Sequence, residues 1–177
     1  QFIVTATASS GLTVDFTSAT PTICTTSSTN GKLIMILAVG ACTLNANQIG
    51  DVNFNAAPQA SATFNVLKAS QTISFAPLLD HVLGDPAFTL AAAASSGLAV
   101  VFTSSTASVC SVTSNIVSIV SMGTCTIVAG QAGNGSYLAA TNVTQSFTIK
   151  STQAINGFTP PTSYVLGSAT VITLTAT

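Results

Sequence analysis

The chain has 177 residues, of which 47% are hydrophobic and only 4% are charged, with three Lys, four Asp and neither Arg nor Glu. Three scattered Lys cannot form the clustered basic patch that displaces counterions from phosphates, so composition excludes nucleic-acid binding. The longest apolar run, 33–39, is far shorter than the ~18 residues that a membrane-spanning helix needs, so we expect no membrane span.

Taken from the N-terminus, the chain consists of short candidate strands separated by turn residues. Polar and apolar residues alternate in 13–17, 117–120 and 125–129, and turn clusters recur about every 8 to 12 residues. Asn30-Gly31 lies between two apolar runs, which is a strong hairpin signal. No long amphipathic helix is visible, so we predict an all-β fold with about seven short strands per period, as in a β-sandwich.

The sequence also repeats itself. Residues 2–12 match 88–98 at an offset of 86, and this register continues to Cys24 on Cys110. Beyond these cysteines the offset becomes 83, with 40–44 on 123–127. The three-residue difference falls near 29–32, between the cysteines of the first copy.

A third copy begins near Ser151. Phe158 and Pro160 repeat Phe75 and Pro77 at an offset of 83. We therefore expect three segments: a first repeat without its opening strands, a complete second repeat, and the opening strands of a third. Their expected bounds are 1–68, 69–150 and 151–177.

These repeats resemble the immunoglobulin-like repeats of large bacterial surface and secreted proteins, of the bacterial Ig-like (Big) and MBG type. The motifs that carry the resemblance are 71–75, 83–85, 94–98, 102–106, 109–112, 123–127 and 131–134. The resemblance implies tandem immunoglobulin-like β-sandwich repeats that serve mostly as spacers and stalks without an activity of their own.

The four cysteines occupy equivalent positions in two copies. One bond per repeat, Cys24 to Cys42 and Cys110 to Cys125, gives both copies the same structure, whereas other pairings do not. Such bonds predict an oxidising compartment outside the cytosol. Zinc is the competing interpretation, but no cysteine pair has the close spacing of a structural zinc site.

Groups suited to catalysis are scarce, so we expect no enzyme, no catalytic residue and no cofactor. Asp80, His81 and Asp85 could form a catalytic or metal-binding cluster, or simply a polar loop. The third copy has Ser163, Tyr164 and Ser168 at the matched positions, which favours the loop.

Calcium is a second alternative, since Asp and Asn oxygens are its usual ligands. Candidate oxygens cluster in one stretch of the first copy, whereas the matched stretch of the second copy has Asn134 and Ser136 and no carboxylate, so we predict no metal site. The candidates are Asn45, Asn47, Asp51, Asn53 and Asn55. Phe54 and Tyr137 occupy matched positions and could form a carbohydrate platform, but we expect both to plug the core.

The favoured hypothesis is a structural extracellular module at the cell surface, forming a stalk or filament. Its partners would be adjacent repeats or further copies of itself, because a nearly uncharged surface permits close packing. The alternative is an adhesive or glycan-binding module that contacts a matrix or glycan. Residues 151–177 could also complete the first repeat of a neighbouring chain by adding a strand. Gln1 opens no signal-peptide pattern, so we expect any export signal to lie upstream or to have been removed.

Overall fold

The computed structural model describes residues 1–156, and within them it contains strands, one turn of 3-10 helix and no α-helix. The predicted all-β class is therefore confirmed. None of the described residues forms a helix long and apolar enough to cross a membrane. The predicted strands of a third copy from Phe158 onward lie outside the described residues, and 151–156 form no strand.

The described residues divide into two compact units, one made of 1–74 with 92–101 and 129–143, the other of 75–91 with 102–128 and 144–156. The expected boundaries after residues 68 and 150 stay a prediction.

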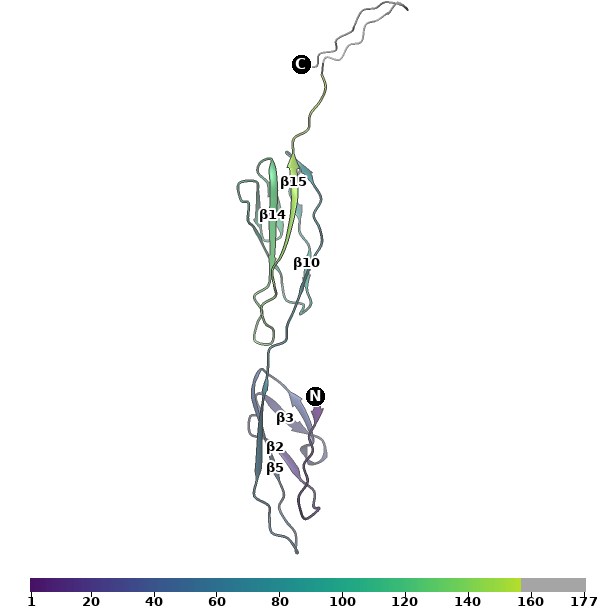
Figure 1. The fold of residues 1–177 in the computed structure, drawn as a ribbon, viewed down its shortest axis with the longest axis vertical. Coiled ribbons are helices and arrows are strands. Elements are labelled where there is room, and N and C mark those ends of the chain that lie inside the picture. Colours follow the sequence, from purple (N-terminus) through teal and green to yellow (C-terminus); the bar gives the residue numbers. More distant parts are fainter. Residues whose placement is uncertain (157–177) are drawn as a thin grey trace, which may run out of the picture. The chain divides into compact units, whose positions relative to one another are not determined.

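Six strands of the first unit form two antiparallel sheets, in the orders β1-β4-β3 and β2-β5-β6. Their bounds are β1 Phe2–Ile3, β2 Asp15–Ser18, β3 Cys24–Ser27, β4 Leu33–Ile36, β5 Gly40–Asn47 and β6 Ala60–Val66. In β5 and β6, apolar residues recur at every second position, which places them on one face of the sheet. Figure 1 labels β2, β3 and β5.

The core of these sheets is small and centred on a disulfide. Cys24 in β3 bonds to Cys42 in β5, so the bond joins the two sheets. Ile34 and Leu44 are buried against it. Since few large side chains fill this core, the covalent link between the sheets carries a large share of the stability of the unit.

The hairpin predicted at Asn30-Gly31 joins β3 to β4, but its connection is longer than two residues. Residues 28–32 separate the strands, with one 3-10 turn, Thr29–Gly31. Gly31 has a φ of 65°, and a Cβ there would collide with the carbonyl oxygen of Phe16. This close approach of two backbones explains why a glycine occupies the position.

Nine further strands lie between residues 73 and 150. They form the sheets β11-β14-β15-β8 and β12-β13-β9 and the pair β10-β7, and Figure 1 shows β14 and β15 side by side. Strand β8 runs parallel to β15. The bounds are β7 Ile73–Phe75, β8 His81–Val82, β9 Phe88–Thr89, β10 Ala92–Ala94, β11 Val101–Ser104, β12 Cys110–Thr113, β13 Ile116–Ile119, β14 Gly123–Gly130 and β15 Val143–Lys150.

Several strands recur at the offsets found in the sequence. Strand β11 lies 86 residues after β2, while β14 and the start of β15 lie 83 residues after β5 and β6. The change of offset falls in the hairpin, because five residues join β3 to β4 and only two, 114–115, join β12 to β13. Among the described residues, β7, β8 and β10 have no counterpart strands before residue 60.

Candidate functional site

The two disulfides occupy the same local setting. Cys110 in β12 bonds to Cys125 in β14, with Cα atoms 5.7 Å apart, compared with 5.8 Å for Cys24 and Cys42. All four cysteines are fully buried. Each bond therefore links one sheet to another inside the core.

A pair of hydroxyl side chains accompanies each disulfide. The Ser18 and Thr20 hydroxyl oxygens lie 3.5 and 3.7 Å from Cys24 Sγ. Ser104 and Thr106 stand in the same relation to Cys110, at 3.3 and 3.7 Å. These partners were not predicted from the sequence, although Ser, Thr and Cys have the same spacing in 18–24 and 104–110.

The two threonines also bind the strand that carries the second cysteine. Thr20 Oγ1 accepts a hydrogen bond from the Thr43 N–H, and Thr106 Oγ1 accepts one from the Thr126 N–H, each at 2.9 Å. A hydroxyl that satisfies a backbone donor next to a buried disulfide holds both strands in register. The four residues are structural components of the cross-link.

The oxygens considered for calcium mostly take part in hydrogen bonds of the protein itself. Asp51 Oδ1 accepts the N–H groups of Asn53 and Phe54, at 2.8 and 2.9 Å. Asn45 and Asn47 lie on β5 and accept hydrogen bonds from side chains on or beside β6. Among residues 1–156, no group of three or more His, Cys, Asp or Glu could hold a metal ion.

The matched loop of the second copy uses Asn134 in the place of Asp51. Asn134 Oδ1 accepts the N–H groups of Ser136 and Tyr137, at 2.8 and 2.9 Å. Since the amide oxygen of Asn134 accepts the same two backbone hydrogen bonds as the carboxylate of Asp51, the charge of Asp51 is not needed for this turn. Phe54, which follows the turn, is 49% exposed, so the expectation that it plugs the core is wrong.

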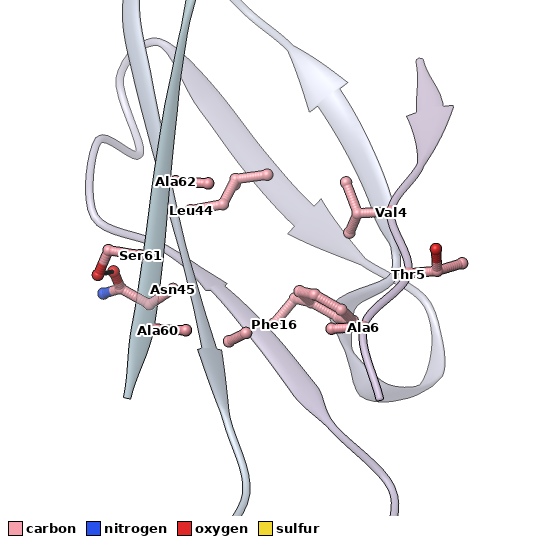
Figure 2. A pocket seen from close by; sticks show the side chains of 10 residues that line it. Val4, Thr5, Ala6, Phe16, Leu44, Asn45, Ala60, Ser61 and Ala62 are labelled. Carbon is pink, nitrogen blue, oxygen red and sulfur yellow. Dashed lines mark hydrogen bonds between the residues drawn. The ribbon is translucent and has the colours of Figure 1, made fainter. Parts of the chain in front are cut away.

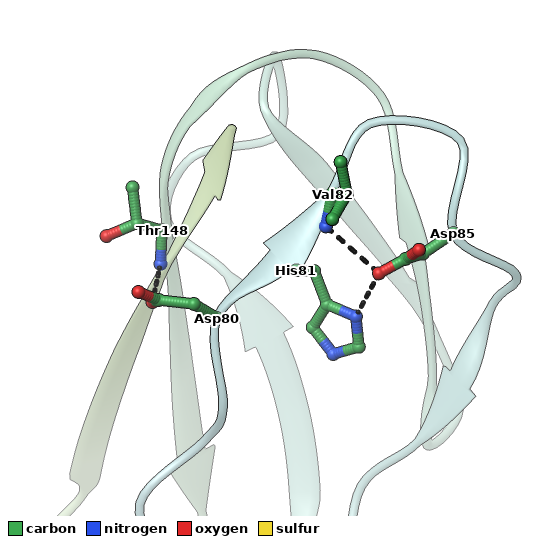
Figure 3. A network of polar contacts seen from close by, with 5 residues as sticks. All are labelled: Asp80, His81, Val82, Asp85 and Thr148. Atoms are coloured by element: carbon green, nitrogen blue, oxygen red, sulfur yellow. Dashed lines mark hydrogen bonds and ion pairs between the residues drawn. The ribbon is translucent and has the colours of Figure 1, made fainter. Parts of the chain in front are cut away.

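The Asp80, His81 and Asp85 cluster attaches β8 to the end of β15 (Figure 3). Asp80 Oδ1 accepts the Thr148 N–H at 2.7 Å. His81 Nδ1 lies 2.9 Å from Asp85 Oδ2, and the imidazole stacks on the Phe88 ring with centroids 4.3 Å apart. These contacts support the interpretation of a polar loop, since each group has a structural partner.

Hydrogen bonds lower the pKa of Asp85. The Val82 N–H donates to Asp85 Oδ2 at 2.9 Å, and this hydrogen bond, followed by that of His81, lowers the pKa of Asp85 below its ordinary value. Both donors favour the ionised carboxylate. The group is therefore held as an anion that closes the turn after β8.

An apolar opening lies in the first unit, between β6 and the segment that follows β1. It is a groove of about 290 Å³, shown in Figure 2 with the side chains that line it. Phe16 and Leu44 form its floor, while Ala6 and Ala62 lie on opposite sides. A second opening of about 110 Å³ extends it past Ala46 toward Gln48. We call both together the Phe16 groove.

The position matched to the Phe16 groove is filled in the second copy. There the Phe75 ring packs on Phe102, the counterpart of Phe16, with centroids 5.5 Å apart. Phe75 is only 6% exposed, and its carbonyl oxygen accepts a hydrogen bond from Gln145 Nε2 at 3.0 Å. Gln145 is the counterpart of Ala62. The groove is therefore the place that a strand like β7 occupies.

Comparisons with known proteins give only distant similarities. No family model matches the chain, and no curated protein matches it. Two solved structures of the S-layer protein SbsC are similar. Its domains 4 and 5 match at 14% identity and a TM-score of 0.35, over 82% of this chain and 79% of that one. The structure rSbsC(31-844) matches at 12% identity and a TM-score of 0.36, over 82% and 21%. A TM-score below 0.5 does not establish a shared fold, so neither similarity assigns a function.

Proposed function

We propose that this chain is a structural, non-catalytic segment of an extracellular protein, built from tandem immunoglobulin-like sandwiches that form a stalk or filament. The observation that carries the proposal is the recurring disulfide between sheets, Cys24 to Cys42 and Cys110 to Cys125. Each bond connects strands of two different sheets, so pulling on the chain cannot separate those sheets while the bond is intact.

The distribution of reactive groups supports a role without chemistry. None of the four carboxylates recurs at the matched position of the next copy, where Asp15 becomes Val101 and Asp51 becomes Asn134. A repeated module that catalysed a reaction would retain its acid or base. What the copies do share is the cross-link, its hydroxyl partners and the turn after β5 or β14.

The disulfides also support the proposed location. Bonds of this kind persist outside the cytosol, in secreted and surface proteins. The low charge of the chain suits an assembly in which neighbouring modules touch, because little electrostatic repulsion opposes contact.

The test is to pull single chains by their two ends and record extension against force. A structural module gives separate, repeatable unfolding steps, each shortened by the loop that its disulfide closes. A chain that extends smoothly at low force, without such steps, would overturn the proposal.

A further inference from the structure

The Phe16 groove is bounded by backbone that lacks a strand partner in the described part of the chain. Strand β6 is at the edge of the sheet β2-β5-β6, whereas its counterpart β15 has β8 on its outer side. Residues 6–8 form no strand, whereas the matched 92–94 form β10 paired with β7. Unpaired edges of this kind are templates for an added strand.

Apolar side chains on β5 and β6 are more exposed than their counterparts on β14 and β15. Phe64 and Val66 are half-buried, while the matched Phe147 and Ile149 are 3% and 1% exposed. Ala46 is likewise half-buried, while the matched Ala129 is fully buried. The first copy thus keeps an apolar surface that the second copy covers, and covering it would release water from that surface.

Contacts in the second copy indicate which chemistry suits the groove. Beyond the Phe75 ring, Gln71 Nε2 donates to Gln131 Oε1 at 2.7 Å. The counterpart of Gln131 is Gln48, at the far end of the Phe16 groove. The matching ligand is therefore an extended, uncharged segment with a glutamine at one end and a phenylalanine a few residues later.

We propose that the Phe16 groove binds residues 152–160 of a second copy of this chain, which adds a strand beside residues 6–8, as β7 pairs with β10 in the second copy. This inference rests on the proposed structural function and names the partner of the first unit. The segment has Gln153, Ile155, Phe158 and Pro160 in the order of Gln71, Ile73, Phe75 and Pro77. No charged residue occurs in 151–177, so insertion into an apolar groove buries no charge.

The spacing of the segment differs from that of β7 by one residue. Two positions separate Ile73 from Phe75, whereas three separate Ile155 from Phe158. An extra residue in a strand is accommodated by a bulge, for which glycine is well suited, and Gly157 lies at this point of the sequence. Insertion with a bulge would keep Ile155 and Phe158 on the same face of the added strand.

Two variants of the full chain separate the roles of segment and groove. Phe158→Ala removes the aromatic side chain from the inserted segment. Ala62→Glu places a charge at the groove, at a position where the second copy already carries the polar Gln145. The matched control is Asn65→Glu, because Asn65 lies on the same strand, is exposed and does not line the groove. Circular dichroism and thiol titration confirm that each variant is folded and oxidised.

Light scattering coupled to size-exclusion chromatography measures the assemblies. The unaltered chain and Asn65→Glu are expected to form oligomers that grow with concentration, while Phe158→Ala and Ala62→Glu each remain monomeric. Mixing these two variants is expected to give dimers, because one retains a free groove and the other an intact segment. Loss of the Phe158 ring should weaken association roughly 30-fold or more.

Several outcomes would overturn the inference. An unaltered chain that stays monomeric at all concentrations, including one whose own segment folds back, contradicts binding between copies. Oligomers that persist in both variants, or a mixture that gives no dimer, point to another surface. In each case unfolding steps shortened by the disulfides would still support the structural function, so the failure of one proposal is distinguishable from the failure of the other.

Discussion

Reducing the disulfides should lengthen the two unfolding steps by different, calculable amounts. Cys24 and Cys42 are 18 residues apart in sequence, which corresponds to about 60 Å of extended chain at ~3.3 to 3.6 Å per residue. The intact bond holds their Cα atoms 5.8 Å apart, so it conceals about 55 Å of that length. For Cys110 and Cys125, 15 residues apart with Cα atoms at 5.7 Å, the concealed length is about 45 Å.

The assay is single-molecule force spectroscopy with and without a thiol reductant. One step is expected to gain about 55 Å on reduction and the other about 45 Å. In a double variant, Cys24→Ala with Cys42→Ala, the unfolding step of the first copy should be lengthened even without reductant. Adding the reductant should then lengthen only the unfolding step of the second copy. This variant assigns each step to its disulfide.

Two results would refute the reasoning. Step lengths that do not change on reduction would mean that the bonds do not interrupt the path of the force. A gain of about 280 Å would correspond to the 86 residues between Cys24 and Cys110, and would indicate a bond between the two copies.

Three further predictions concern stability. Gly31→Ala should lower the free energy of unfolding in urea by about 2 kcal/mol or more, because the new Cβ meets a backbone carbonyl. Gly11 also has a positive φ, 74°, but open space around it, so Gly11→Ala should lower the free energy of unfolding by only about 1 kcal/mol. Equal losses in the two variants would contradict the steric argument. Because folding lowers the pKa of Asp85, its contribution is present above the unfolded pKa and lost as pH falls below about 4. Asp85→Asn should therefore flatten the acid limb of the stability profile, and an unchanged limb would count against the hydrogen bonds. Phe75→Ala should cost about 3 to 5 kcal/mol by emptying a buried site, compared with less than about 0.5 kcal/mol for Leu79→Ala at 82% exposure; similar thermal unfolding of both variants would contradict the packing.

Sequence periodicity and turn residues were enough to predict the all-β fold class and the location of the hairpin at Asn30-Gly31. Alternation of apolar residues reports which face of a strand is buried, and this information is local. The two offsets also indicated which cysteines are equivalent, since two copies with one structure need the same pairing. The structure places both bonds between sheets, which the sequence could not specify because strand order depends on distant contacts.

Only the tertiary structure decided what the polar and aromatic residues do. Asp51 and Asn134 differ in charge but cap the same turn, and this equivalence appears only when their backbone partners are located. Phe54 was expected in the core and lies half exposed, because its neighbours along the chain do not reveal which strands pack nearby. The Phe16 groove, too, depends on which strands pack against one another. Its floor and walls come from segments separated by up to 58 residues in sequence, from Val4 to Ala62, and the absence of a strand beside them within the described residues is a property of packing, which no local pattern encodes.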